Sequence, residues 1–319
     1  MMSLTRYSRF SLLYMMESDK KGVDQMPDIG LRFHKDMLVL SSPIDEVLKR
    51  QGVDIAQDKE FINLVEPDAI RDIYRLEEVA GAQCLITNTA GITRACLAHS
   101  NMEDRDFEIA TASLSILKSL KPQHIFAEIG PCGLPLDASS AASLKQNKSQ
   151  YERAVEVFGE NGYDAFFLNG MKNPVDMKCA LMGVRAQSDM PLIASIDADH
   201  FTENEELCDV FAMMEQYGAQ VLGFSSAAPL DEVCERAQLC RQKSDLPLLV
   251  QLKVPHINPK QSAVLQNLPY FHADTMVEAA TRLRGVGIQF LRAEGAATPA
   301  YTAALVAASA GFDVVVAGR

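Results

Sequence analysis

The sequence lacks the patterns that define several large classes of protein. No apolar run is long enough to cross a bilayer, and no segment has a low-complexity composition. Neither a GxGxxG pattern after the first apolar run nor a phosphate-binding GxxxxGK(S/T) pattern occurs, which disfavours a nucleotide-binding sheet. The residues that are present, 48% hydrophobic and 23% charged, are typical of a soluble globular protein.

Basic residues are in short supply as well. Lys and Arg number 30 against 42 Asp and Glu, which gives a formal net charge of -12 and an isoelectric point near 5.0. Binding to nucleic acids and anionic lipids draws on clustered Lys and Arg, so we expect neither a nucleic-acid nor a membrane partner. The expected partner is a small-molecule substrate.

Cysteine usage gives no sign of a disulfide framework. The seven cysteines are an odd number, and no two of them form a CxxC pair. The short apolar stretch at residues 10–16 follows Arg6 and Arg9, as in a signal peptide, but no small-residue cleavage site comes after it. We therefore expect a cytoplasmic protein in a reducing compartment.

Short apolar runs recur along the chain with helical patterns between them. Eight runs are predicted as strands: residues 37–40, 83–87, 124–128, 165–168, 192–196, 221–224, 248–252 and 288–291. Their continuous apolar character indicates burial on both faces, and the helices between them indicate parallel connections. Strand and helix alternating eight times predict an α/β fold, a single (β/α)8 TIM barrel rather than an open doubly wound sheet.

The two ends of the chain depart from this pattern. Residues 1–36 have no clear period and are predicted as an N-terminal extension that covers the bottom of the barrel or frays. Residues 37–311 form the predicted barrel. Residues 312–319 resemble a further strand, which an eight-stranded barrel does not need. This strand-like tail either pairs with a partner subunit or marks a chain cut from something longer, so a homodimer is compatible with the sequence.

Several motifs resemble the homocysteine S-methyltransferase family, which includes the first barrel of cobalamin-dependent methionine synthase. Residues 58–71 contain an Asn-Leu-x-x-Pro element, and residues 80–89 end in Thr-Asn-Thr. Residues 129–133, Ile-Gly-Pro-Cys-Gly, and residues 223–226, Gly-Phe-Ser-Ser, follow the same family order, as does the Thr-Pro pair at 298–299. The resemblance covers about residues 37–311 and implies the same barrel fold.

The resemblance also implies a chemistry. Family members hold zinc through three cysteine thiolates and leave one coordination position open for the thiol of homocysteine. A free thiol with a pKa of about 8.5 is only a few per cent ionised at neutral pH, and zinc stabilises the nucleophilic thiolate. The thiolate then takes a methyl group from a corrinoid, a sulfonium or a related donor.

This chain departs from the family at the zinc centre. The cysteine expected after the sixth strand falls on Ser226, and the cysteine pair expected after the eighth falls on Glu294 and Gly295. We therefore expect no zinc and assign no metal ligand. A Glu-Thr pair expected after the fourth strand is Asn169-Gly170, and an Asp-Gly pair expected after the first is replaced at residues 41–43 by Ser-Ser-Pro. The loss of acidic groups indicates that homocysteine itself is not the substrate.

Polar residues at the predicted strand ends are the candidates for the site, because barrel enzymes build their active sites there. The predicted catalytic residues are Glu128, Asp197 and Glu294. The predicted substrate-binding residues are Asn88, Asn169, Ser226, Lys253 and His256.

Glu128 ends an apolar strand, so its carboxylate needs a partner inside the barrel. Lys253 in the seventh strand is the predicted partner, in a pair that is either structural or an anchor for substrate. Asn88 either lines the pocket or makes a hydrogen bond at a strand end.

Two alternatives stay open for the acidic loop residues. Asp197, Asp199 and His200, with His256 and Glu294, could form a metal site rich in oxygen and nitrogen, or an acid/base pair. The alternative for Asp199 and His200 is a loop that caps a helix beginning near Thr202, since Thr202-x-x-Glu205 is a capping-box pattern. The alternative for Glu294 is a solvated loop carboxylate.

Three functions follow from these residues. The first is methyl transfer, from a methylcorrinoid or methylfolate and with a corrinoid protein as partner, to an acceptor that needs no zinc. The second is a catalytically inactive family member that serves as a binding or assembly subunit. The third is an acid/base or divalent-metal enzyme built on Glu128, Asp197, Asp199 and Glu294.

Overall fold

The structure is a computed structural model in which residues 28–33, 35–53, 55, 59–159, 162–256 and 268–309 are described. Residues 1–27 of the predicted N-terminal extension lie outside the described residues, and so does the strand-like tail predicted for residues 312–319.

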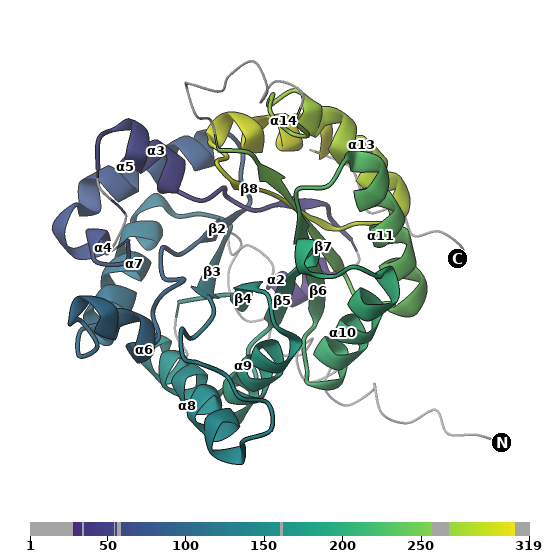
Figure 1. Ribbon diagram of the computed structural model, residues 1–319. Helices are drawn as coiled ribbons and strands as arrows, with labels where there is room; N and C mark the ends of the chain where they lie inside the picture. Colours follow the sequence, from purple (N-terminus) through teal and green to yellow (C-terminus); the bar gives the residue numbers. More distant parts are fainter. Residues whose placement is uncertain are drawn as a thin grey trace, which may run out of the picture.

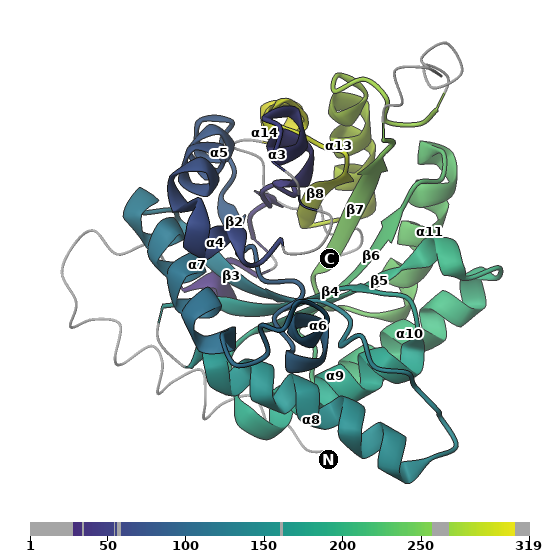
Figure 2. The ribbon, with the colours of Figure 1, turned by 60° about the vertical axis from the view of Figure 1, so that its left-hand side comes forward.

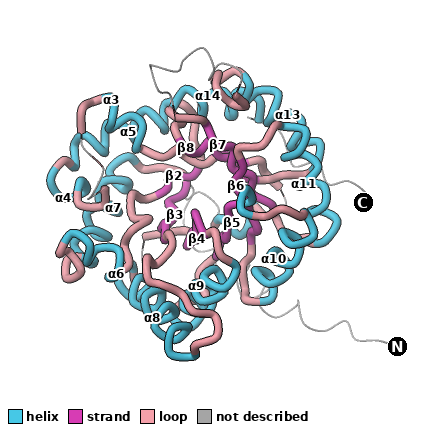
Figure 3. The backbone as a smooth tube through the Cα atoms, viewed as in Figure 1, coloured by secondary structure: helices cyan, strands magenta, loops and turns pink. Residues whose placement is uncertain are grey.

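Eight parallel strands surround a common axis, and helices connect each strand to the next (Figures 1 and 3). The hydrogen-bonded order is β1-β8-β7-β6-β5-β4-β3-β2, and a parallel bridge between Leu40 and Cys84 joins β1 back to β2. The predicted (β/α)8 barrel is confirmed. The strands are β1 Leu38–Val39, β2 Cys84–Ile86, β3 His124–Ile129, β4 Ala165–Met171, β5 Leu192–Asp197, β6 Val221–Ser226, β7 Leu248–Val254 and β8 Phe290–Gly295.

Apart from the short α2, which lies within the ring of strands in Figure 1, the helices lie outside the strands (Figures 1 and 2). None of the described helices is both long and apolar enough to cross a membrane. The helices are α2 Ile29–Arg32, α3 Asp45–Arg50, α4 Ile62–Val65, α5 Pro67–Val79, α6 Arg94–Leu97, α7 Asp106–Leu120, α8 Ala141–Phe158, α9 Pro174–Gln187, α10 Asn204–Gln216, α11 Leu230–Lys243, α13 Thr275–Val286 and α14 Pro299–Ser309, with the 3₁₀ helices η2 Ala98–Ser100 and η3 Ala198–His200.

Apolar side chains fill the barrel from its lower end. The inner cluster includes Phe126, Phe167 and Phe290, each fully buried, while a larger cluster fills the space between strands and helices. Burial of each such side chain contributes about 1.5–3 kcal/mol. Because side chains alternate along a strand, the positions two residues further on, 128, 169 and 292, also point inward but lie nearer the barrel mouth.

Helix α2 closes the lower end of the barrel. Ile29 packs into the inner cluster, and the ring of Phe33 meets that of Phe290 edge-on, with centroids 5.9 Å apart. The side-chain amide of Gln289 donates to the carbonyl of Arg32 at 2.8 Å. The opposite end, where the strands terminate, is left for a binding site.

Two helices differ in how their first turns are capped. Helix α8 begins at Ala141, where the Ser140 hydroxyl accepts from a backbone N–H. Helix α10 begins at Asn204 and has no side-chain cap, so the capping box predicted from Thr202 and Glu205 is wrong. The preceding 3₁₀ turn η3 delays the start of α10, and it is capped by the side chain of Asp197.

We expect Gly223→Ala, in β6, to lower the free energy of unfolding by about 1–3 kcal/mol, because overpacking a dense core forces its neighbours to move. A Cβ at this position would lie 2.9 Å from the Cβ of Leu249. Gly285→Ala is the matched control, since a Cβ there meets nothing within 4 Å and the residue lies in helix α13. The control should gain up to about 1 kcal/mol. Urea unfolding of both variants measures the difference, and equal effects would contradict the packing described for the barrel.

Candidate functional site

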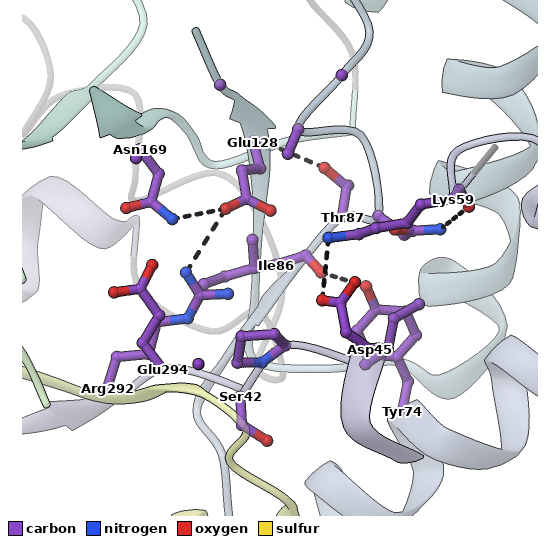
Figure 4. Close-up of a pocket in the computed structure, with 18 of the residues that line it drawn as sticks. Ser42, Asp45, Lys59, Tyr74, Ile86, Thr87, Glu128, Asn169, Arg292 and Glu294 are labelled. Atoms are coloured by element: carbon purple, nitrogen blue, oxygen red, sulfur yellow. Dashed lines mark hydrogen bonds and ion pairs between the residues drawn. The ribbon is translucent and has the colours of Figure 1, made fainter. Parts of the chain in front are cut away.

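A cavity of about 500 Å³ opens at the carboxyl ends of the strands, on the side formed by β1 to β4 and β8 (Figure 4). This volume lies in the range of small-molecule sites. Its polar lining residues are Ser42, Asp45, Lys49, Lys59, Tyr74, Thr87, Asn88, Glu128, Asn169, His256, Arg292 and Glu294. Five residues predicted for the site therefore line this cavity: Asn88, Glu128, Asn169, His256 and Glu294.

Four buried side chains form a closed ring of polar contacts below this cavity. Asn169 Nδ2 donates to Glu128 Oε1 at 2.8 Å, and Gln251 Nε2 donates to Asn169 Oδ1 at 2.8 Å. Arg292 Nη1 donates to Gln251 Oε1 at 3.1 Å and lies 3.5 Å from Glu128 Oε1, which closes the ring. Charged hydrogen bonds of this kind are strong where water is excluded.

Further contacts hold the guanidinium of Arg292 in place. Its Nε donates to the carbonyl of Ser41 at 3.0 Å, and its carbon lies 5.7 Å from the ring centroid of Phe167. Gln251 Nε2 also donates to Ser195 Oγ at 2.7 Å, which ties the ring to β5. The ring therefore joins five strands and fixes the orientation of Glu128.

The predicted pair between Glu128 and Lys253 is wrong. Glu128 pairs with Arg292, while Lys253 bonds to Asp197 and Asp199. The register of β7 and β8 explains the difference, because Gln251 is level with Arg292 and Lys253 lies one layer nearer the mouth. The predicted eighth strand ended at residue 291, which hid the alternation that turns Arg292 inward.

Glu294 belongs to strand β8 and is not a solvated loop residue. Its Oε2 is buried and has no hydrogen-bond partner among the residues that the structure describes. Burial raises the pKa of this carboxyl above its usual value, although Arg292 and Lys253 act in the opposite direction. Figure 4 shows the carboxyl beside the Arg292 side chain, at the edge of the cavity. A raised pKa makes the ionised carboxylate a stronger base than an ordinary glutamate.

Lys59 provides a cation in the cavity lining, and no prediction from the sequence had singled it out. Its Nζ lies 3.1 Å from Asp45 Oδ2. Burial alone would lower the pKa of Lys59, but the carboxylates of Asp45, Glu128 and Glu60 raise it overall. The Lys59 side chain therefore stays protonated and contributes a positive charge to the cavity. The signal missed was the position of Lys59 within the family-like segment 58–71.

Asn88 is held in one orientation by the backbone. Its Nδ2 donates to the backbone carbonyl of Lys59 at 2.8 Å, and the backbone carbonyl of Asn88 accepts from Asn63 Nδ2 at 2.7 Å. Its Oδ1 is buried, and no side chain or backbone group in the described part of the chain bonds to it. Asn88 thus presents an acceptor oxygen in the cavity wall.

The predicted residues on β5 to β7 form a separate ion-pair cluster. Lys253 Nζ bonds to Asp197 Oδ1 and lies 2.9 Å from Asp199 Oδ2, while the Ser226 hydroxyl donates to Asp199 Oδ1 at 2.7 Å. Burial raises the pKa of Asp199, but hydrogen bonds from Ser226, Lys253 and Ala227 outweigh it and lower the pKa. Asp197, Ser226 and Lys253 are not among the described residues that line the cavity.

The two histidines considered for a metal site lie apart from each other. His200 Nδ1 is 3.2 Å from Asp197 Oδ2, whereas His256 is two-thirds exposed at the cavity rim, 4.0 Å from Glu46 Oε2. In the part of the chain that the structure describes, no three His, Cys, Asp or Glu side chains gather as metal ligands. The geometry gives no support to the predicted divalent-metal alternative.

A thiolate zinc site also does not fit the donors present. The three positions that the family resemblance assigns to ligands carry Ser226, Glu294 and Gly295. Ser226 Oγ is already bonded to Asp199 and accepts from Arg236 at 3.2 Å. No cysteine is among the described residues that line the cavity. A neutral hydroxyl is a poor zinc ligand and glycine offers no side chain.

We expect Arg292→Met to lower the free energy of unfolding by about 3–5 kcal/mol, since it leaves the buried Glu128 carboxylate without its cation. Urea unfolding at pH 7 measures the loss. Adding Glu128→Gln to this variant should recover part of it, because a neutral amide needs no countercharge. If the two changes add without coupling, the described ion pair is not formed.

The raised pKa of Glu294 also makes stability depend on pH. In the unfolded chain this carboxyl has a pKa of about 4.3. Between that value and the higher folded-state pKa the folded chain binds more protons, so stability falls as pH rises. The stability of Glu294→Gln relative to wild type should therefore increase across this window. Glu278→Gln, which removes an exposed carboxylate on α13, is the control in pH-dependent thermal melts. If the difference in stability between wild type and Glu294→Gln does not change with pH, the pKa of Glu294 is not raised by folding.

Known proteins share both the sequence pattern and the fold of this chain. The family model described as homocysteine S-methyltransferase matches residues 39–280. A methionine synthase from Mycobacterium tuberculosis is 22% identical over 207 residues, which cover 60% of this chain but only 17% of that protein. The homocysteine methyltransferase MmuM from Escherichia coli, in its metallated form, superposes with a TM-score of 0.69 at 18% identity, over 85% of this chain and 96% of that one. Its oxidized form gives a TM-score of 0.70 with the same identity and coverage. The chain therefore belongs to the homocysteine S-methyltransferase family.

Proposed function

We propose that this protein transfers a methyl group to a small polar acceptor bound in the cavity, without activation of the acceptor by thiolate-bound zinc. The family supports methyl transfer as the reaction class. The observation that carries the proposal is the position of Glu294, because a carboxyl whose Oε2 is buried and lacks a hydrogen-bond partner among the described residues stands where the family resemblance expects a zinc ligand. A base at that position would take over the task of activating the nucleophile.

The step can be written with this chain's residues. The acceptor gives up its proton to the Glu294 carboxylate, and its freed electron pair forms the bond to the methyl carbon. The bond between that carbon and the donor breaks, and its electron pair stays with the donor. The donor class we propose is a methylcorrinoid or a methylfolate, which a corrinoid protein would bring to the barrel mouth in the first case.

The remaining cavity residues would bind and orient the acceptor. Glu128 is fixed by Arg292 and Asn169, so it offers a preorganised carboxylate. Asn88 and the Lys59–Asp45 pair would contact polar groups from the other side. Asp197, also predicted as catalytic, is bonded to Lys253 outside the cavity and has a positioning role at most in this proposal.

The proposed setting is the cytoplasm. All seven cysteines are free thiols, and five of them are buried. Burial raises the pKa of Cys132 to about 11, and its Sγ donates to Asn147 Oδ1 at 2.8 Å, which suits an inert structural thiol. A reducing compartment would keep such thiols in this state.

A methyl-transfer assay tests the proposal. Purified protein is given methylcobalamin or methyltetrahydrofolate with a panel of small thiols, amines and alcohols, in the presence and absence of a zinc chelator. We expect transfer that survives the chelator, and a loss of about 10²–10⁴-fold in kcat/KM in Glu294→Gln. The control Glu278→Gln should keep the wild-type rate. Activity abolished by chelation, or full activity of Glu294→Gln, would contradict the proposal, and no transfer from either donor would favour the assembly-subunit alternative.

A further inference from the structure

One of the carboxyl groups around the cavity has an oxygen that lacks a hydrogen-bond partner among the described residues. Three carboxyl side chains line it, from Asp45, Glu128 and Glu294. Asp45 has Lys59 at 3.1 Å, and Glu128 has Arg292 at 3.5 Å. Among the described residues no ion pair or hydrogen bond reaches Glu294 Oε2.

Neither of the neighbouring cations, Lys253 and Arg292, forms a described ion pair with Glu294. Lys253 is level with Glu294 in the β7–β8 register, but its ammonium is held between Asp197 and Asp199. Arg292 uses Nε for the carbonyl of Ser41 and Nη1 for the buried ring. Glu294 thus keeps an acceptor oxygen whose partner must come from outside the described side chains.

A second unpartnered acceptor lines the same cavity. Asn88 Oδ1 is buried without a donor, and the amide cannot turn to present its nitrogen because Nδ2 is bonded to the carbonyl of Lys59. Two buried acceptors, one of which is ionisable, favour a ligand that carries N–H donors and a positive charge. An anionic ligand would face the carboxyl groups of Glu294, Glu128 and Asp45, and the Lys59 ammonium is already paired with Asp45.

We infer that the cavity binds a ligand with a primary ammonium or amidinium group, with its N–H groups directed to Glu294, and that this nitrogen is the methyl acceptor. The inference rests on the proposed function, since it names the acceptor class for that same site. In the reaction the ammonium gives one proton to Glu294. The neutral nitrogen then forms the bond to the methyl carbon while the carbon–donor bond breaks towards the donor.

Calorimetric binding in the absence of any methyl donor tests the inference with three matched probes. The probes are 4-amino-1-butanol, 1,4-butanediol, which exchanges the ammonium for a hydroxyl, and (4-hydroxybutyl)trimethylammonium, which keeps the charge without N–H donors. We expect the amine to bind at least ten-fold more tightly than either other probe, a difference of about 1.4 kcal/mol or more. Equal binding of the diol and the amine would overturn the inference. Equal binding of the trimethyl probe and the amine would refute the claim that N–H groups are recognised.

Variants locate the bound nitrogen. Glu294→Gln should weaken amine binding at least ten-fold and leave diol binding unchanged, while Glu294→Asp keeps the charge and should lose less. Glu278→Gln is the control for the removal of a carboxylate outside the cavity. If Glu294→Gln does not fold, the comparison of probes on the wild-type protein and on Glu294→Asp still decides. Unchanged amine affinity in a folded Glu294→Gln would overturn the inference.

The outcome separates this inference from the proposed function. Amine binding with no methyl transfer from either donor would keep the ligand class and refute the methyltransferase proposal. Methyl transfer to thiols or alcohols without selective amine binding would keep the proposed function and refute the ligand class.

Discussion

Arg292 places a guanidinium inside the barrel, and the side chains around it are those that such a buried charge requires. The Glu128 carboxylate, the Gln251 amide and the Ser41 carbonyl lie within 3.5 Å of it. The Asn169 amide bonds to Glu128 and Gln251 and so completes the ring. Below this ring the barrel is filled with aromatic and aliphatic groups, as Phe167 under the guanidinium illustrates. Removing any one member would leave the others desolvated and unpaired, so the ring acts as one unit. The floor of the cavity is therefore rigid.

The ring also divides the barrel mouth into two parts with different character. On β5 to β7, Lys253 neutralises Asp197 and Asp199 and leaves a set of ion pairs that satisfy one another. On the other side, the cavity keeps acceptor oxygens on Asn88 and Glu294 that have no partner. Satisfied networks stabilise a fold, whereas unsatisfied buried groups in a cavity indicate a binding site. The chemistry we propose lies entirely in this second part.

The sequence was sufficient for the barrel but not for the pairing inside it. Continuous apolar runs separated by helical patterns predicted all eight strands, because burial on both faces requires them. Polar strand ends also indicated Glu128, Asn169 and Glu294, which line one cavity. The partner of Glu128 was missed because pairing depends on register between strands, which local patterns do not contain. Lys59 and Asp45 were missed because neither ends a strand: Asp45 is the first residue of α3, and Lys59 lies shortly before α4.

Glu294 stands at a position where the family resemblance expects a zinc ligand, and the proposed chemistry depends on its carboxyl. The direct measurement is an NMR titration of carbon-13-labelled Glu carboxyls in wild type, with Glu294→Gln used to assign the signal. We predict that Glu294 titrates above the ordinary range of about 4.3, and that its pKa falls when 4-amino-1-butanol binds, since a bound cation stabilises the carboxylate. A carboxyl that titrates in the ordinary range and does not respond to the amine would contradict the account.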